Sequence, residues 1–296
     1  MSTTILKRAL GTSGHEVYPV GLGAMPLSLR GRPSAEDAVR VICAALDAGM
    51  ELIDTADAYC LDDADVGHNE RLIARALREW RGGREVVVAT KGGVIRPGGE
   101  WGHDGRPEHL TRACEASLRA LSTDCIELYQ LHTPDEGVEF TDSVGALARL
   151  QEAGKIRHVG LSNVTVTQIR EASRLVTVVS VQNRASPYHP QGLTDGVLAH
   201  CESESIAFLP YSPVGGWQAG KTAHEPVLQS VGNRRGVTPY QVVLAWLLAK
   251  SPAVIPIPGA SRVSSGVDSA VAAAIMLRPE DHQELDRAYL SNEGDG

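Results

Sequence analysis

Short apolar runs alternate with amphipathic helical segments from residue 20 to the end of the chain. Such runs are typical of strands buried on both faces, and a helix between successive strands implies a parallel sheet. The helices are marked by one apolar face and by their terminators: Ser34 can cap the first helix and Gly49 can end it. We predict strands at 20–23, 52–54, 86–90, 126–131, 156–161, 178–182, 206–210 and 254–257, helices at 34–48, 69–80, 107–121, 143–153, 166–175, 193–204, 238–250 and 267–276, and a short surface helix from 279.

Eight strand–helix units follow one another without a linker or a change in composition. In a chain of 296 residues, this pattern favours an α/β fold with one domain, a closed (β/α)8 TIM barrel over residues 1–296. The alternative, a doubly wound open sheet, needs a glycine-rich phosphate loop, but Gly21 and Gly23 lack the third glycine of that loop. We also expect an N-terminal β-hairpin at 5–18 that plugs one end, and extended loops on the catalytic face at 92–106, 183–192 and 212–225.

The composition excludes several classes of protein. Hydrophobic residues make up 43% of the chain, enough for a full core, so the chain is not disordered. The net charge of -8 argues against a nucleic-acid or anionic-membrane partner. Five cysteines without a C-x-x-C pair or zinc-ligand spacing indicate reduced thiols and no metal site. Residues 1–8 lack the apolar run of a secretory signal and no run is long enough to span a bilayer, so we expect a soluble, cytoplasmic protein.

Polar side chains follow three consecutive predicted strands, at the end where a barrel carries its chemistry. Asp54 ends the second strand and Tyr59 lies in the loop after it, while Lys91 and His132 stand at the ends of the third and fourth strands. Each residue also has an ordinary structural explanation, such as a turn cap, a solvated strand end or a core histidine. Because the three strand ends meet at one edge of a barrel, we interpret the four residues as one site.

These groups together suit a general acid that protonates an oxyanion. A tyrosine has a pKa near ~10, and an adjacent ammonium lowers it. A carboxylate would hold that ammonium in place, and a histidine would orient a carbonyl oxygen. The set offers neither a nucleophile nor a metal, so a hydride cofactor must supply electrons to the carbonyl carbon. Trp101 and Trp217 lie in two of the extended loops, and we predict that they wall the substrate pocket beside Tyr59 and His132.

Eight segments of the chain resemble the motifs of the aldo-keto reductase superfamily, in the family's order and over nearly the whole length. Any one of these segments alone is weak evidence for the family, whereas eight segments in the same order are highly specific evidence. They are GMELIDTADAY at 49–59, GHNE at 67–70, TKGG at 90–93, LH at 131–132, GKIRHVGLSN at 154–163, VQN at 181–183, PYSP at 210–213 and IPIPGASR at 255–262.

The resemblance implies a catalytic tetrad of Asp54, Tyr59, Lys91 and His132, with Tyr59 as the acid in reduction. It implies NADPH/NADP+ as cofactor, a small-molecule carbonyl as substrate, and no metal. Two positions depart from the family pattern, because Ser265 and Ser269 stand where His or Arg and Asn are usual; this bears on cofactor affinity and not on the tetrad. The implied cofactor residues are Gly23, Ala24, Met25, Asp54, Ser162, Asn163, Gln182, Tyr211, Ser212, Gly215, Lys221, Ser261, Arg262 and Asp268.

Two other functions remain open from the sequence. The superfamily includes proteins that bind the nucleotide, turn over slowly and serve as partners of channels, so a nucleotide-sensing regulatory subunit is the alternative. A barrel lyase with Lys91 as a Schiff base is a third possibility, against which the pairing of tyrosine and histidine argues. The sequence names neither the carbonyl substrate nor the oligomeric state.

Overall fold

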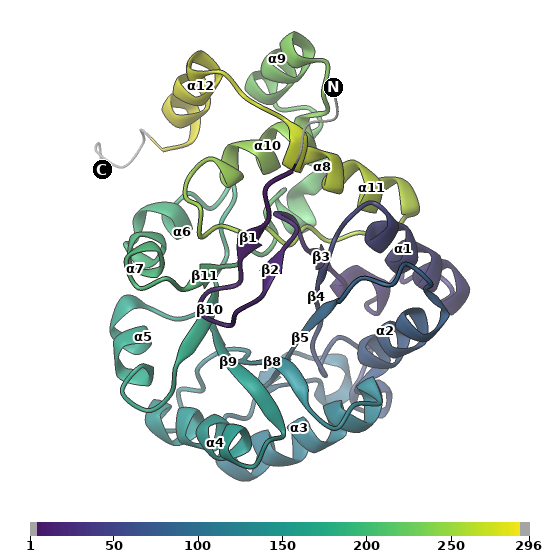
Figure 1. Cartoon of the computed structure of the whole chain (residues 1–296), viewed down its shortest axis with the longest axis vertical. Coiled ribbons are helices and arrows are strands. Elements are labelled where there is room, and N and C mark those ends of the chain that lie inside the picture. Colours follow the sequence, from purple (N-terminus) through teal and green to yellow (C-terminus); the bar gives the residue numbers. More distant parts are fainter. Residues whose placement is uncertain (1–4, 291–296) are drawn as a thin grey trace.

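A parallel sheet curls around the centre of the molecule, and helices surround it (Figure 1). The computed structural model describes residues 5–290. The predicted domain, 1–296, also includes residues 1–4 and 291–296, which lie outside the described residues. The sheet has seven strands in the order β11-β10-β9-β8-β5-β4-β3, all parallel. They are β3 (Leu22–Gly23), β4 (Leu52–Asp54), β5 (Val87–Gly92), β8 (Ile126–Leu131), β9 (Ile156–Ser162), β10 (Val178–Gln182) and β11 (Ala207–Phe208).

The extended segment 254–259 closes the sheet between its two edge strands. On one side, the Ile255 amide donates to the Phe208 carbonyl at 2.8 Å; on the other, the Gly23 amide donates to the Pro258 carbonyl at 2.9 Å. The predicted eighth strand is present only as isolated bridges. The amides of β3 donate to carbonyls of this segment, but Pro256 and Pro258 have no N–H to donate back to β3. A regular two-way ladder of hydrogen bonds therefore cannot form between this segment and β3. The closed arrangement agrees with the predicted barrel.

Helices form the outer layer and mostly begin where the sequence predicts. Thr238 caps α10 through a capping box with Gln241, and Gly49, at a φ of 110°, ends α1. The helices are α1 (Ala35–Asp47), α2 (His68–Glu79), α3 (Pro107–Leu121), α4 (Phe140–Glu152), α5 (Val166–Ala172), α6 (Gln191–Thr194), α7 (Val197–Ser203), α8 (Ala219–Thr222), α9 (Pro226–Arg235), α10 (Pro239–Leu248), α11 (Val263–Val271) and α12 (Pro279–Tyr289).

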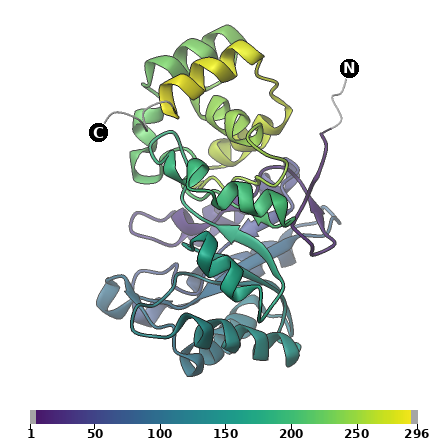
Figure 2. The same ribbon diagram turned by 90° about the vertical axis from the view of Figure 1, so that its left-hand side faces the viewer.

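Several helical segments differ from the prediction. Helix α4 begins at Phe140, three residues earlier than predicted, and the short helix α8 was not predicted. The predicted helix 193–204 is divided into α6 and α7 at Gly196, whose φ of 87° is outside the helical region. Helix α11 begins at Val263, four residues earlier than predicted, and ends before Met276. Helix α9 was not predicted, and it packs beside α12 away from the barrel (Figures 1 and 2), where Arg234 and Arg235 both pair with Asp281.

A short antiparallel hairpin, β1 (Arg8–Ala9) and β2 (Glu16–Val17), lies across one end of the barrel (Figure 1). Seen from the side, it stands at the edge of the molecule (Figure 2). Leu10 and Val17 of the hairpin are buried in the same cluster as Leu128 and Ile255 from the barrel interior. The hairpin therefore contributes apolar side chains to the barrel interior and covers the end opposite the ends of the strands that carry Lys91 and His132.

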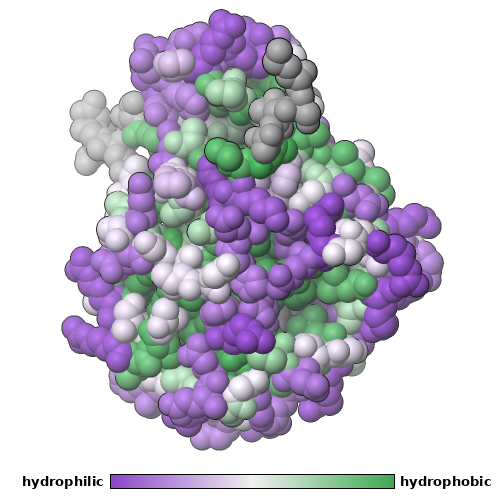
Figure 3. Space-filling model, in the orientation of Figure 1, coloured by the Kyte–Doolittle hydropathy of each residue, from purple (hydrophilic) through white to green (hydrophobic). Residues whose placement is uncertain are grey.

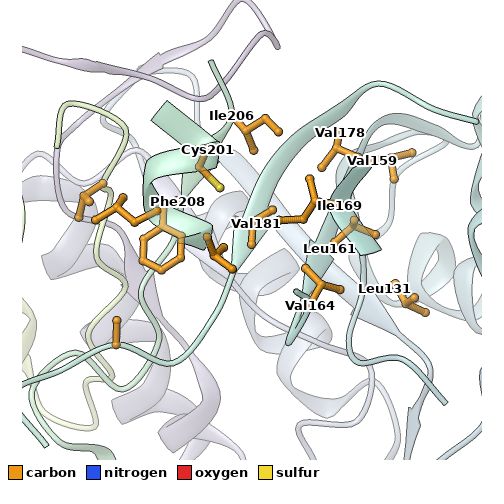
Figure 4. Packing of buried hydrophobic residues seen from close by; sticks show 14 of the residues in the cluster. Leu131, Val159, Leu161, Val164, Ile169, Val178, Val181, Cys201, Ile206 and Phe208 are labelled. Atoms are coloured by element: carbon orange, nitrogen blue, oxygen red, sulfur yellow. The ribbon is translucent and has the colours of Figure 1, made fainter. Parts of the chain in front are cut away.

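The largest apolar cluster lies between the sheet and its outer helices. Figure 4 shows Val159, Leu161 and Val181 of the strands packed against Ile169 of α5 and Cys201 of α7. This layer fixes each strand with respect to its helix, and so fixes the strand ends.

Extended loops follow β5, β10 and β11. The loop after β5 contains a second hairpin, β6 (Val94–Ile95) and β7 (Gly102–His103), and the loop after β11 contains a 3-10 turn, Gly216–Gln218, followed by α8. Within residues 5–290, none of the helices combines the length and the apolar character needed to cross a membrane.

Candidate active site

An ion pair between Lys91 and Asp54 forms the centre of the site. Both residues sit at the carboxyl ends of neighbouring strands, β5 and β4, and the Lys91 side chain is 0% exposed. Its Nζ donates to Asp54 Oδ1 at 2.7 Å and to the Thr55 carbonyl at 2.7 Å. Burial lowers the pKa of the Lys91 ammonium, and the Asp54 carboxylate opposes that shift. The predicted contact between these two residues is present.

Tyr59 lies in the turn that follows β4, with its hydroxyl on the same ammonium. Lys91 Nζ donates to the Tyr59 hydroxyl oxygen at 3.2 Å. The turn is anchored by the Asp57 amide, which donates to the Lys91 carbonyl, and by the Tyr59 amide, which donates to Ala56. Burial raises the pKa of Tyr59 well above its ordinary value, and the charge of Asp54 adds to the shift. The direction is opposite to the lowering expected from the ammonium alone, because desolvation of a buried phenol disfavours the phenolate.

His132 completes the set from the end of β8. Its amide donates to the Gly92 carbonyl at 2.9 Å, which continues the pairing of β8 with β5 by one residue. The imidazole stands edge-on to the Tyr59 ring, with 5.7 Å between centroids. Burial, followed by the charge of Lys91, lowers the pKa of His132 well below its ordinary value, so the ring is neutral at pH 7. A neutral imidazole donates one hydrogen bond without adding a charge to the site.

The second carboxylate oxygen of Asp54 contacts two buried side-chain amides, those of Gln182 and Gln130. Gln182 Nε2 donates to Asp54 Oδ2 at 2.7 Å, and Gln130 Nε2 lies 3.4 Å from the same oxygen. Gln182 was predicted only as a cofactor residue, and Gln130 was not predicted at all. Strand alternation contained the signal, because Gln130 follows the interior residue Leu128 by two positions and therefore points into the barrel.

A cavity of about 330 Å³ opens above these side chains. Tyr59 and Asp54 are among the residues that line it, and its lining is mainly apolar. It brings together residues from the first, seventh and eighth strand ends, as expected of a barrel. Of the residues predicted from the sequence, those lining it are Gly23, Met25, Asp54, Tyr59, Tyr211, Ser212, Trp217 and Ser261.

Other predicted cofactor residues lie close to the tetrad without lining this cavity. Ser162 is buried at the end of β9, and Asn163 follows it with a φ of 58°. The Asn163 side-chain Nδ2 donates to the His132 carbonyl at 3.0 Å, and its Oδ1 accepts from the Tyr211 hydroxyl at 2.8 Å. Asn163 thus links His132 to Tyr211. Ala24 is buried beside the site, where its amide donates to the Asp54 carbonyl.

The remaining predicted cofactor residues come from the loop after β11 and from α11. Gly215 has a φ of 100° at the start of the 3-10 turn, and Lys221 is exposed on α8. Arg262 is exposed at the N-cap of α11, and none of the described residues pairs with its guanidinium. Asp268 is engaged differently: its carboxylate accepts from Gln241 Nε2 at 2.9 Å. A cofactor role for Asp268 stays a prediction.

The two tryptophans have different surroundings. Trp217 lines the cavity at its mouth and is 82% exposed. Trp101 does not line the cavity; its ring stacks on the Arg96 guanidinium, 4.0 Å from the centroid. Arg96 in turn donates to the carbonyls of Cys60 and Leu61, directly after Tyr59. Trp101 is therefore connected to the turn that carries Tyr59 and not to the cavity wall.

Comparison with known proteins agrees with this geometry. Residues 19–290 match the aldo/keto reductase family. An uncharacterized oxidoreductase of Schizosaccharomyces pombe is 35% identical over 94% of this chain and 88% of its own length. Two crystal structures are similar: a thermostable aldo-keto reductase in complex with the inhibitor epalrestat (29% identity, TM-score 0.81, 96% and 99% of the two chains) and an aldo-keto reductase from Klebsiella pneumoniae in complex with NADPH (28%, 0.77, 97% and 96%). The chain belongs to the aldo/keto reductase family.

Proposed function

We propose that this protein reduces an aldehyde or ketone to the alcohol with NADPH, and that Tyr59 is the general acid. The observation that carries the proposal is Tyr59, which lines a mainly apolar cavity and has its hydroxyl 3.2 Å from a lysine ammonium that Asp54 holds in place. A buried ammonium at that distance would stabilise the tyrosinate that forms once the proton leaves.

The residues around the cavity fit a nicotinamide dinucleotide. Tyr211 presents an aromatic ring to the cavity, and Gln182 donates only from its Nε2, which leaves Oε1 as an acceptor for a carboxamide. Arg262 supplies a planar cation without a partner among residues 5–290, at the start of a nine-residue helix, which suits a phosphate. Bound NADPH would supply the hydride. Its presence in the similar Klebsiella pneumoniae enzyme supports the assignment.

The four central residues would divide the remaining work. Because burial raises the pKa of Tyr59, its hydroxyl keeps its proton at neutral pH and can donate it to a carbonyl oxygen. Lys91 would stabilise the phenolate, and Asp54 would hold the lysine charged. The neutral His132 would donate a hydrogen bond that orients the carbonyl.

The test is Tyr59→Phe, with Tyr18→Phe as the matched control. The Tyr18 hydroxyl donates to the Ala270 carbonyl in the outer helical layer, and this contact does not involve the tetrad. Removing a general acid typically costs about 10²–10⁴ in rate, so Tyr59→Phe should lower kcat by that factor and leave NADPH affinity within about twofold. A Tyr59→Phe enzyme with wild-type kcat would disprove the acid assignment. If Tyr18→Phe lost the same activity, the effect would not be specific to the site.

A further inference from the structure

Three potential metal ligands from three different elements meet at the hairpin-covered end of the barrel. They are His15 in the turn that leads into β2, Glu127 in β8 and His158 in β9. One ligand atom of each lies within 4.8 Å of the other two. His15 Nε2 is 2.7 Å from Glu127 Oε1, and His158 Nε2 is 3.5 Å from the same oxygen. Residues this far apart in the sequence have no recognisable ligand spacing, which is why the sequence predicted no metal.

One nitrogen of the cluster lacks a hydrogen-bond partner. Among residues 5–290, none is hydrogen-bonded to His158 Nε2, which is buried and lies 3.5 Å from Glu127 Oε1. A buried nitrogen without a partner is uncommon, and a metal ion would satisfy it.

We propose that His15, Glu127 and His158 form a site for a divalent transition-metal ion, with Zn²⁺ the best fit. Two imidazoles and one carboxylate are ligands that Zn²⁺ accepts, whereas Mg²⁺ and Ca²⁺ prefer all-oxygen sets. Ligand atoms around a tetrahedral Zn²⁺ stand about 3.3 Å apart for bonds of about 2.0 Å. The 3.5 Å separation is close to that value, and the ion would replace the proton shared by His15 and Glu127.

Neighbouring groups would complete the site. Glu85 Oε1 is 3.7 Å from His15 Nδ1, on the far side of the ring from the cluster, where a carboxylate commonly orients a ligating histidine. Arg157 Nε donates to Glu127 Oε2 at 3.0 Å and not to Oε1, the oxygen that His15 and His158 approach. The two carboxylates and one guanidinium give the surroundings a net charge of -1, which favours a cation and does not fully neutralise it.

The position suggests a structural role. Glu127 is at the beginning of β8, whereas His132 follows the end of that strand, so the cluster and the tetrad lie at opposite ends of the barrel. Figure 3 shows hydrophilic residues across the middle of the hairpin-bearing face. The side chains of His15, Glu127 and His158 are each about one fifth exposed, so an ion can reach them from solvent. A bound ion would tie the hairpin, through His15, to β8 and β9.

The first experiment uses the full-length chain, freed of metal with a chelator and titrated with ZnCl2 in a calorimeter. We expect one saturable site. At free Zn²⁺ about 100 times the Kd, the linkage relation and the size of the chain give a rise in Tm of roughly 4 °C. MgCl2 at the same concentration should leave Tm unchanged. The absence of saturable Zn²⁺ binding would overturn the proposal.

Variants locate the site. His15→Ala and His158→Ala should each weaken Zn²⁺ binding at least about tenfold, since each removes one of three ligands. His224→Ala removes an exposed histidine elsewhere and should have no effect. Cys125→Ser tests the thiol close in sequence to Glu127, and should bind Zn²⁺ normally. Binding that survives both histidine changes, or that disappears in Cys125→Ser, would place the ion elsewhere.

A spectroscopic measurement separates ligation from folding. Co²⁺ bound by the wild-type chain should give visible d–d bands of a low-coordinate site, and His158→Ala should lose them. Glu127→Gln provides a second variant, because it keeps the size of the side chain and one acceptor oxygen but removes its charge. Loss of the bands in both variants, with Tm measured without metal unchanged, would confirm direct ligation. Unchanged bands in both would refute it.

Discussion

Lys91 is a charged side chain with no exposed surface, and its three hydrogen bonds explain how that is tolerated. Asp54, the Thr55 carbonyl and the Tyr59 hydroxyl accept one bond each, which uses every donor of the ammonium. A buried charge without such partners would be strongly destabilising. The same bonds fix the direction of the Tyr59 hydroxyl, so a single residue serves both stability and the proposed chemistry.

Arg262 carries the proposed preference for NADPH over NADH. Its exposed guanidinium has no partner among residues 5–290, so it is available to the 2′-phosphate that only NADPH carries. A charge-assisted contact is worth about 1.5–3 kcal/mol, so Arg262→Ala should weaken NADPH binding about tenfold to a hundredfold and NADH binding much less. Fluorescence titration with each cofactor measures both constants.

Lys221→Ala is the matched comparison for Arg262→Ala. The family resemblance places Lys221 in the loop that covers the pyrophosphate, which both cofactors share, so this change should weaken both equally. An equal loss of the two cofactors in Arg262→Ala would show that Arg262 does not contact the 2′-phosphate.

At the scale of elements, the loop after β11 lines the cavity through Trp217, whereas Trp101 in the loop after β5 does not line it. The turn of residues 216–218 lies in a loop that is closed on itself at α8, where the Thr222 hydroxyl donates to the Val214 carbonyl at 2.9 Å. This fastening places Trp217 at the cavity mouth. The hairpin after β5 instead packs Trp101 on Arg96. Similar loop lengths in the sequence thus correspond to different positions relative to the cavity.

Trp217→Ala should raise KM for bulky aldehydes and spare the smallest ones, because only a large carbonyl reaches the mouth of the cavity. The measurement is kcat/KM over a graded series of aldehydes, with Trp101→Ala measured in parallel. A size-dependent change in Trp101→Ala would support the sequence prediction that Trp101 also walls the pocket. A uniform change with a lowered Tm would assign that indole to packing on Arg96. If Trp217→Ala changed kcat/KM by the same factor for all aldehydes of the series, Trp217 would have no role in substrate selection.

At the scale of the whole molecule, buried charges around Lys91 couple stability to pH. Asp57 and Glu70 are both buried, and burial raises the pKa of each. Glu70 joins helix α2 to strand β5, because Thr90 Oγ1 donates to its Oε1 at 2.6 Å. A carboxyl whose pKa is higher in the folded state binds more protons when folded, so stability falls as pH rises.

Glu70→Gln should therefore flatten the dependence of Tm on pH. The loss of stability begins near the ordinary glutamate pKa of 4.5 and continues as pH rises through the higher folded value. The amide keeps an acceptor for Thr90 but cannot ionise. Thermal unfolding between about pH 4 and 8 measures the effect, with Glu152→Gln on the exposed end of α4 as control. An unchanged slope in Glu70→Gln would mean that Glu70 does not ionise in this range.

The sequence by itself determined the order of strands and helices, because burial patterns and terminators such as Gly49 are local. It also determined that Asp54, Lys91 and His132 share one end of the sheet, because parallel strands end together. Only the tertiary structure decided which polar side chains meet there. Gln130 bonds to Asp54 from two strands away, and the pKa of Tyr59 rises because other elements bury it. Helix α9 and the cluster of His15, Glu127 and His158 likewise depend on contacts between distant segments, which no local pattern encodes.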